Sequence, residues 1–344
     1  MLEGAGHRIE SGSEPPRVAI TVGDPAGIGP EIVLKAIVDA DVRRSSRIVL
    51  VGSETLLRST AAQLGLSLKF KPYSTKAGDA DHIFINDPGG LPAKTAPGIE
   101  SADTGKAAAL CIETAVAMWK NGEIDAIATA PISKNALAMA GYKYPGHTEF
   151  LAELTNTREF AMSFFADKLR VVLLSTHCSL LDAIAKVKTD ALVDLIKFTE
   201  RSMRELLRRN VRLAVAGLNP HASEGGMFGS EEADEITPAI EICRSQHGID
   251  VSGPYSPDTI FLRGFRGEFD AVVACYHDQA TIAVKSLSFG SAVNVTLGLP
   301  LIRTSVDHGT AFDIAGKGVA DESSMKAAIR LAADLVTCSK GSIS

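Results

Sequence analysis

Short apolar runs rich in valine and isoleucine alternate along this chain with longer segments in which apolar residues recur every three or four positions. The runs are typical of buried strands and the longer segments of amphipathic helices, so the pattern predicts an α/β fold built from βα units around a mostly parallel sheet. The expected strands cover residues 18–22, 47–52, 82–86, 125–130, 170–176, 212–218, 270–276 and 292–299. The expected helices cover residues 30–41, 54–65, 102–120, 148–155, 190–208, 231–246 and 321–336.

Composition narrows the class of protein. The chain has 344 residues, of which 45% are hydrophobic and 22% charged, which is typical of a globular protein of about two domains. No apolar run approaches the roughly 20 residues of a membrane helix. The net charge of −6 argues against nucleic acid or an anionic membrane as a partner, because both require a basic face. A small anionic substrate remains compatible with a local basic cluster.

Cysteine usage and the N-terminus indicate the compartment. The five cysteines are scattered and lack any C-x-x-C pair, which predicts neither a disulfide framework nor a thiolate zinc site and favours a reducing cytoplasm. Residues 1–16 have no apolar core, so we expect a disordered extension rather than a secretory signal.

Three histidines directly follow expected strands: His177, His221 and His277. Ligands of open α/β sheets bind beyond the carboxyl ends of the strands, so these imidazoles can converge on one crevice. Three imidazoles with one open position form a catalytic type of metal site. Nearby carboxylates would orient the rings, and the candidates are Asp182, Glu224 and Asp278. Alternatively, each histidine is separately hydrogen-bonded at the end of its strand.

A second group of residues predicts an anion site. In YPGHTE (144–149), a glycine-led turn places His147 and Thr148 at the start of a helix, where backbone N–H groups favour a phosphate or carboxylate. Further along, Lys285, Asn294 and Arg303 recur at nine-residue intervals around a strand, which would bring them to one end of the fold.

Standard nucleotide and hydrolase motifs fail in detail. The segment VAITVGDPAGIGPEI (18–32) resembles a dinucleotide fingerprint, but Ile32 replaces the third glycine and Pro30 removes an N–H from the turn. A Walker loop and a G-x-S-x-G elbow are both absent. Any nicotinamide cofactor therefore requires a scaffold of another type.

Together the motifs resemble the 4-hydroxythreonine-4-phosphate dehydrogenases of pyridoxal phosphate biosynthesis. The resemblance runs from Val18 to Leu335 and is carried by VGDPAGIGPE, YPGHTEFLAE, STH, GLNPHASEGGMFGSEE, GPYSPDTIF, YHDQ and VNVTLGLPLIRTSVDHGTAFDIAGKG. It implies a two-domain, non-Rossmann fold like that of isocitrate and isopropylmalate dehydrogenases. The outer α/β domain would comprise residues 17–143 and 297–344, and the central α/β domain, which carries the dimer interface, residues 144–296.

Position by position, the resemblance makes His177, His221 and His277 the ligands of a divalent metal, zinc, magnesium or cobalt. The family pattern places this site at the interface of a homodimer, with His277 reaching it from the partner subunit. The substrate, a small phosphorylated hydroxy acid, would be held by His147, Thr148, Lys285, Asn294 and Arg303. Asp258 and Asp278 match acidic positions near the metal and are the candidate catalytic residues.

The implied reaction is oxidation at C3 of 4-phosphooxy-L-threonine by NAD or NADP. A metal-bound hydroxyl loses its proton to a base while hydride leaves for the nicotinamide, and the β-keto acid then loses CO₂. The base stays open between Asp258, Asp278 and a lysine. Related branches oxidise 4-phospho-D-threonate or 4-phospho-D-erythronate, which makes a sugar-acid dehydrogenase the alternative, whereas the retained anion residues argue against a dihydrodiol substrate.

The chain departs from the common family pattern at three positions near the site: Ser223 replaces a glycine, and Ala280 and Ala283 replace a glycine and a proline. These changes spare the expected ligands but can reshape the pocket. Two other classes of function fit the same residues, a non-catalytic metabolite-binding protein and a hydrolase in which a metal activates water. Reduction of NAD separates the dehydrogenase from both.

Overall fold

The computed structural model describes residues 14–74, 82–91, 95–288 and 290–340. Most of the expected N-terminal extension, residues 1–13, lies outside the described part. The described end of this segment is held by Arg47. The Glu14 carboxylate accepts a 2.8 Å hydrogen bond from the Arg47 side chain, and the Pro16 carbonyl accepts a 2.8 Å hydrogen bond from the Arg47 backbone N–H.

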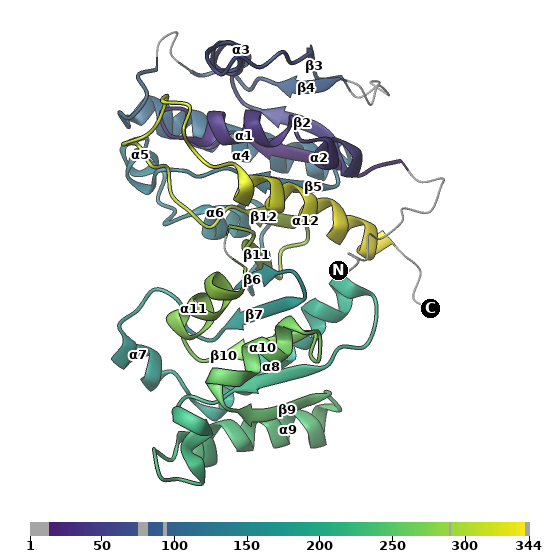
Figure 1. Ribbon diagram of the computed structural model, residues 1–344, viewed down its shortest axis with the longest axis vertical. Coiled ribbons are helices and arrows are strands. Elements are labelled where there is room, and N and C mark those ends of the chain that lie inside the picture. Colours follow the sequence, from purple (N-terminus) through teal and green to yellow (C-terminus); the bar gives the residue numbers. More distant parts are fainter. Residues whose placement is uncertain (1–13, 75–81, 92–94, 289, 341–344) are drawn as a thin grey trace, which may run out of the picture.

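One twelve-stranded sheet runs through the described chain, in the order β3-β4-β2-β1-β5-β12-β11-β6-β7-β10-β8-β9 (Figure 1). Each expected strand is confirmed within one to three residues at its ends, which shows the predicted α/β class. They are β1 (Arg17–Thr21), β2 (Arg47–Val51), β4 (Ile83–Asn86), β5 (Ala126–Thr129), β7 (Leu169–Leu173), β8 (Leu213–Ala216), β10 (Ala271–Ala274) and β11 (Val293–Leu297). The pattern missed β3 (Phe70–Pro72), β6 (Ala161–Ala166), β9 (Val251–Tyr255) and β12 (Ile302–Ser305).

The sheet is parallel except at its centre. There β11 runs antiparallel to both β12 and β6, and β6 runs antiparallel to β7. Only two residue pairs join β11 to β12, Asn294 with Ser305 and Val295 with Thr304. Thr296 and Arg303 follow on the two strands without pairing through their backbones, so the turn between them opens a gap inside the sheet.

The expected helices are present, with one correction. The segment predicted as one helix over 30–41 is two helices, α1 (Gly29–Ala36) and α2 (Ala40–Ser45). The break occurs because the Asp39 carboxylate accepts hydrogen bonds from two backbone N–H groups and starts a new helix. The others are α3 (Glu54–Gln63), α4 (Ala102–Lys120), α6 (His147–Leu154), α8 (Thr189–Leu207), α9 (Thr237–His247), which a π-helical turn (Glu232–Ile236) precedes, and α12 (Ser323–Lys340).

Four helices of the described chain escaped prediction, and two of them, α5 and α7, are too short to show an apolar period. They are α5 (Lys134–Met139), α7 (Leu180–Ala185), α10 (Pro257–Phe265) and α11 (His277–Leu287). Helix α11 matters most here, since its first residue is one of the three strand-end histidines.

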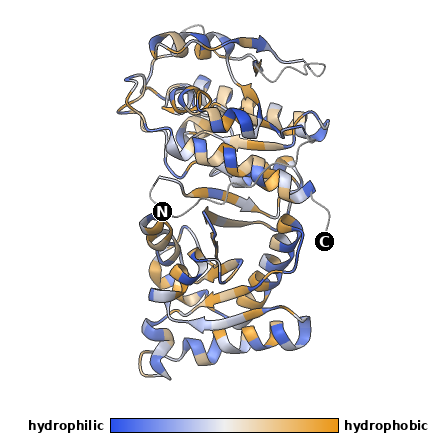
Figure 2. Ribbon diagram, turned by 45° about the vertical axis from the view of Figure 1, so that its right-hand side comes forward, coloured by the Kyte–Doolittle hydropathy of each residue, from blue (hydrophilic) through white to orange (hydrophobic). Residues whose placement is uncertain are grey.

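Three clusters of buried apolar side chains hold the fold together. The first surrounds β1, β2, β4 and β5, the second lies under α8, α9 and α12, and the third lies under α10 and α11. Figure 2 shows the strands as the apolar layer of both halves. Helix α12 joins the halves, because Met325 and Ile329 belong to the first cluster while Ala328 and Leu335 belong to the second. The division at residues 144 and 297 stays a prediction.

The glycine-rich segment after β1 packs backbone against backbone. A Cβ added at Gly29 would lie 2.1 Å from the carbonyl oxygen of Val22. The buried Asp24 carboxylate accepts hydrogen bonds from Ala26 N at 2.9 Å and from the Thr104 hydroxyl at 3.4 Å, and burial raises its pKa. These contacts account for the glycines of this segment as packing residues, in keeping with the failed dinucleotide fingerprint.

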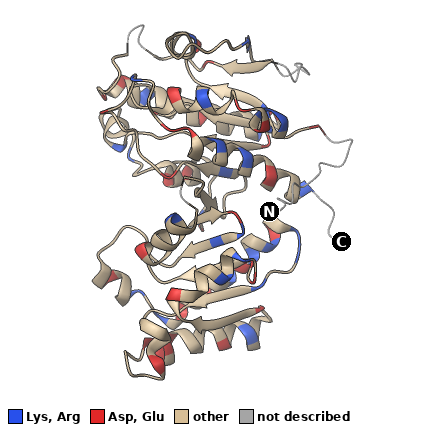
Figure 3. Cartoon of the chain, viewed as in Figure 1, with Lys and Arg blue, Asp and Glu red and all other residues tan. Residues whose placement is uncertain are grey.

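Charged residues of both signs are interspersed over both halves in the view of Figure 3. No helix in the described part of the chain is long and apolar enough to cross a membrane.

Candidate functional site

Four of the five expected substrate residues lie around the gap between β11 and β12. Helix α6 begins at His147, directly after the extended Gly146, as the sequence predicted. The Thr148 hydroxyl lies 3.3 Å from the hydroxyl of Thr296, which in turn accepts a 3.1 Å hydrogen bond from Arg303 Nη1. Asn294 sits two residues before Thr296 on the same face of β11. We call His147, Thr148, Asn294, Thr296 and Arg303 the anion site.

Arg303 is a buried cation without a carboxylate partner. It is 3% exposed, and its guanidinium donates only to hydroxyls, to Thr296 and to Thr129 Oγ1 at 2.8 and 3.2 Å. Burial lowers its pKa to about 9, against a weak opposing effect of Glu149. No salt bridge to it occurs within the described residues. A buried arginine in this state gains most from a bound carboxylate or phosphate.

Two further polar atoms of this site lack partners. His147 Nε2 and Asn294 Oδ1 are buried and make no hydrogen bond within the described chain. Burial and the neighbouring Arg303 lower the pKa of His147 well below its usual 6.5, so the ring is neutral at pH 7. Buried unpaired polar groups are costly, and they gather here beside a cation, which is the arrangement that an anionic ligand would satisfy.

Lys285 lies apart from this group. Its ammonium pairs with Asp307 Oδ2 at 3.0 Å, and its side chain is 55% exposed. Asp307 follows β12 by two residues, so the ion pair holds α11 near the end of the strand that carries Arg303. The lysine therefore stands at the rim of the anion site rather than inside it.

Two of the three strand-end histidines line one hollow. A cavity of about 440 Å³ is bordered by Thr176, His177, Cys178, Tyr276, His277 and Asp278 together with Leu180 and Ala183 of α7. The ring centres of His177 and His277 are 6.0 Å apart. Asp278 Oδ1 lies 2.7 Å from His277 Nδ1, which leaves Nε2 of that ring for a ligand. We call this cavity the histidine hollow.

His221 lies in a different loop with an unusual backbone. His221, Ala222, Ser223 and Glu224 all have positive φ, between 47° and 67°, before Gly225 and Gly226 continue the left-handed course. Consecutive non-glycine residues in this region are strained, and such strain concentrates at functional sites. The His221 side chain is exposed, and its ring centre lies 6.4 Å from that of Phe228.

The residues present fit a divalent metal only in part within one chain. Two imidazoles sharing a tetrahedral metal have ring centres about 5 Å apart, close to the spacing of His177 and His277. Asp278 supplies the carboxylate that commonly orients such a ring. Of the other two carboxylates expected to do so, Asp182 bonds the Ser179 hydroxyl instead, at 2.6 Å. No group of three potential metal ligands lies together among the described residues.

The two candidate catalytic aspartates are both exposed in the single chain. Asp278 follows His277, and its side chain is 73% exposed. Asp258 lies in the first turn of α10, where its carboxylate accepts a 2.5 Å hydrogen bond from Ser256. Helix α10 packs beside the loop that carries His221. The aspartates thus accompany different histidines.

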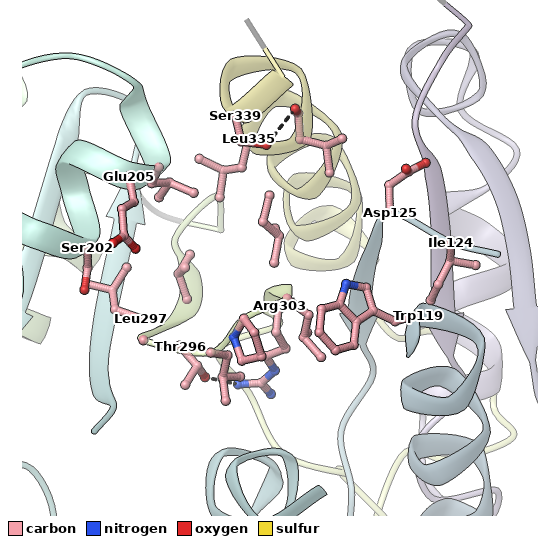
Figure 4. Close-up of a pocket in the computed structure, with 18 of the residues that line it drawn as sticks. Trp119, Ile124, Asp125, Ser202, Glu205, Thr296, Leu297, Arg303, Leu335 and Ser339 are labelled. Atoms are coloured by element: carbon pink, nitrogen blue, oxygen red, sulfur yellow. Dashed lines mark hydrogen bonds between the residues drawn. The ribbon is translucent and has the colours of Figure 1, made fainter. Parts of the chain in front are cut away.

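A second cavity, of about 480 Å³, lies between the ends of α4, α8 and α12, where they surround the turn from β11 to β12 (Figure 4). Trp119, Glu205 and Leu335 form parts of its wall. Arg303 is the one expected site residue that borders it. The chemistry of the side chains, rather than cavity size, therefore places the candidate site at the anion site and the histidine hollow.

Sequence reasoning missed Thr129 and Thr296, which hold the Arg303 guanidinium in place. Thr129 ends β5, whose other residues are apolar, and Thr296 lies next to the end of β11, which is apolar apart from Asn294. A threonine within an apolar strand is too common to single out. The signal that could have found them is their partner, since a buried arginine must find hydrogen-bond acceptors on neighbouring strands.

Comparison with known proteins identifies the class of protein. Residues 44–332 match the family model described as pyridoxal phosphate biosynthetic protein PdxA. The chain is 45% identical over 321 residues, 92% of this chain and 94% of the relative, to a 4-hydroxythreonine-4-phosphate dehydrogenase of Beijerinckia indica. It is 43% identical over 325 residues, 92% of this chain and 98% of the relative, to a D-threonate 4-phosphate dehydrogenase of Pectobacterium atrosepticum.

Solved structures agree. A crystal structure of a 4-hydroxythreonine-4-phosphate dehydrogenase from Klebsiella pneumoniae superposes with a TM-score of 0.85 at 41% identity, covering 93% of this chain and 99% of that one. The chain therefore belongs to the PdxA family, as the sequence motifs indicated.

Proposed function

We propose that the protein is a metal- and NAD(P)-dependent dehydrogenase. It oxidises 4-phosphooxy-L-threonine at C3 to 2-amino-3-oxo-4-phosphooxybutanoate, which decarboxylates to 3-amino-2-oxopropyl phosphate on the route to pyridoxine 5′-phosphate. The observation that carries the proposal is the anion site, where buried Arg303 lies beside two unpartnered polar atoms. Membership of a family whose named relatives are dehydrogenases supports the reaction type.

The chain's own residues bind and orient the substrate in this proposal. Arg303 and Asn294 hold one anionic group inside the sheet, and His147 and Thr148 approach it from the start of α6. Lys285 contributes a second, exposed positive charge at the rim. When the carboxylate and the phosphate at the two ends of the substrate are both held, one C–H bond faces the nicotinamide. This orientation lowers the entropy cost of the reaction.

The proton of the C3 hydroxyl passes to a carboxylate, Asp258 or Asp278, as hydride leaves C3. His177, His221 and His277 would hold a divalent cation, which would supply Lewis acidity at that hydroxyl. Zinc, cobalt and magnesium all suit this role, and the imidazole ligands favour the first two. Loss of CO₂ then breaks the C1–C2 bond. The C3 carbonyl accepts the electron pair of that bond as an enolate, and C2 takes up a proton.

We further propose a homodimer that shares its active sites. The three histidines do not come together in one chain within the described residues, and His277 borders an exposed apolar surface. Leu180 and Leu181 of α7 are 59% and 77% exposed, and Ile282 of α11 is 67% exposed. A second copy would bury these side chains and complete the ligand set. The free cysteines support a cytoplasmic location.

Mixing two inactive variants tests the shared site. His221→Ala and His277→Ala subunits, each inactive alone, should regain up to about a quarter of wild-type turnover when they are unfolded and refolded together, because one of the two sites in a mixed dimer is intact. With His277 supplied by the partner subunit, a mixture of His177→Ala and His221→Ala should stay inactive, since both lesions fall in the same half-site. Recovery in that mixture would instead mean that His177 and His277 act from one subunit, as the 6.0 Å between their ring centres within one chain permits.

A phospho-D-threonate or phospho-D-erythronate substrate is the second candidate. Relatives named for D-threonate 4-phosphate match at 43% and 46% identity, as closely as those named for 4-hydroxythreonine-4-phosphate. The two substrates differ at C2, where one bears an amino group and the other a hydroxyl. NADH formation should be measured with both in parallel, with and without chelator. Chelator-sensitive turnover of the amino acid supports the main proposal, and turnover of the threonate alone selects the alternative.

A further inference from the structure

Two buried side chains connect the loops that carry His221 and His277, and neither has a role in the site described so far. Glu232 is 3% exposed and Gln279 is 8% exposed. Both lie in motifs of the sequence, GLNPHASEGGMFGSEE and YHDQ. The site described so far uses other residues of these two motifs.

Glu232 holds the start of the His221 loop. Its Oε1 accepts hydrogen bonds from the consecutive backbone N–H groups of Leu218 and Asn219, at 2.8 and 2.7 Å, and Oε2 accepts one from Asn219 Nδ2 at 2.9 Å. The Asn219 carbonyl then accepts from Ala222 N at 3.1 Å, inside the left-handed turn. One carboxylate thus fixes the direction in which the chain leaves β8 and enters the strained segment.

Gln279 joins that same point to the start of α11. Its Oε1 accepts from Cys275 N at 2.8 Å, and its Nε2 donates to the Gly217 carbonyl at 2.7 Å. Gly217 immediately precedes the loop that Glu232 holds, and Cys275 lies two residues before His277. The amide therefore sets the separation between the end of β8 and the helix that begins at His277.

The backbone at Gly217, which accepts the hydrogen bond from Gln279, packs closely against both Ala222 and Glu232. A Cβ added at Gly217 would lie 3.0 Å from the Cα of Ala222 and 3.1 Å from Glu232 Oε1. A shift of Glu232 or of Gln279 would therefore displace Ala222, the residue next to His221. Close packing of this kind transmits a displacement rather than absorbing it.

We infer that Glu232 and Gln279 are positioning residues for the metal ligands: Glu232 fixes the loop that carries His221, and Gln279 fixes the start of the helix that carries His277. The inference rests on the proposed metal role of these histidines. Groups that hydrogen-bond a ligand directly commonly change metal affinity by 10–100-fold, and we expect an effect of up to that size from residues that fix the backbone next to a ligand.

The test measures Co²⁺ affinity of the metal-free protein by calorimetry, together with the thermal midpoint Tm. Glu232→Gln and Gln279→Leu are compared with Glu31→Gln. Glu31 is a matched control, because it is also 3% exposed and accepts backbone N–H groups, from Ala320 at 2.8 Å and Gly318 at 3.2 Å, in the other half of the molecule. We expect the Kd for Co²⁺ to rise about 10–100-fold in the first two variants and to stay unchanged in Glu31→Gln, at comparable losses of Tm.

The outcomes separate the two proposals. Wild-type protein that binds no Co²⁺ overturns the metal site itself. Wild-type binding that His221→Ala removes, with unchanged Kd in Glu232→Gln and Gln279→Leu, leaves the site standing and overturns the positioning role. If one of the two variants fails to fold, the other decides, because each removes a different hydrogen bond to the same turn. The KM of the phosphorylated substrate at saturating metal should not change, since the anion site lies on other elements.

Discussion

The anion site and the histidine hollow differ in how completely one chain builds them. At the anion site, Arg303 and its hydroxyl partners sit inside a single sheet, and strand register places them. At the hollow, His177 lies on an exposed loop and faces His277 at the start of α11, while His221 lies in a separate strained turn. A single chain therefore builds the anion site that would bind a negative charge, whereas the proposed chemical step depends on loops and on a second copy of the chain.

That difference has a physical reason. A buried cation must be surrounded by fixed dipoles, and a sheet provides them at low entropy cost. Ligands of an exchangeable metal must remain reachable from solvent.

Removing a strand-end histidine should abolish turnover. His221→Ala is expected to lower metal-dependent activity by more than about 100-fold, because even residues that only orient a ligand cost 10–100-fold. Steady-state NADH formation by metal-analysed protein gives the rate, and circular dichroism gives the fold. Full activity in the variant would contradict the ligand assignment. The exposed His247, on α9, supplies a control substitution that should change nothing.

Replacing Arg303 by methionine should separate binding from stability. The loss of a buried charge partner of the substrate costs about 2–5 kcal/mol, so kcat/KM should fall roughly 10²–10³-fold. Because burial disfavours this guanidinium, as its pKa of about 9 shows, the free protein should keep its Tm or gain a few degrees. Metal affinity should not change. A large loss of Tm with unaltered KM would mean that Arg303 has a purely structural role.

Lys285→Met should have a smaller effect, because the lysine is exposed and already paired with Asp307. Exposed ion pairs contribute up to about 1 kcal/mol, which corresponds to a rise in KM of about fivefold. The effect should weaken further as salt is added. An effect as large as that of Arg303→Met would show that the lysine enters the anion site on binding.

The anion site should also make stability depend on pH. The pKa of His147 is lowered in the folded state, so the unfolded chain takes up the proton first as the pH falls below 6.5. Stability should then decrease with acidification, by up to about 1.4 kcal/mol per pH unit from this group. Urea unfolding at pH 7.5 and 5.5 should show a larger loss for wild type than for His147→Gln. Equal losses would place the ring in a solvated site.

The sequence predicted more of the fold than of the site's assembly. Apolar runs such as 18–22 and 270–276 stand out because strands buried on both faces contain little else. Strand β12 was missed because Arg303 and Ser305 are polar although they are buried. These residues interrupt the apolar run by which a buried strand is recognised. The positions of the three histidines at strand ends marked them as candidate site residues. The sequence did not predict which of them lie close together, because that depends on loop conformations, which leave no periodic pattern in the sequence.

Helix α12 and strand β12 set the order in which this protein can mature on the ribosome. Strand β12 fills the place between β5 and β11, and α12 packs on β1, β5 and β12. The first half of the sheet is thus completed only by residues 302–340, although its other strands are synthesised long before. Residues 161–297 contain a nearly continuous block of the second half and are free to fold earlier. A nascent chain would therefore acquire its histidine loops before its anion site, and loss of the last helix would uncover β1, β5 and β12 where α12 packs on them.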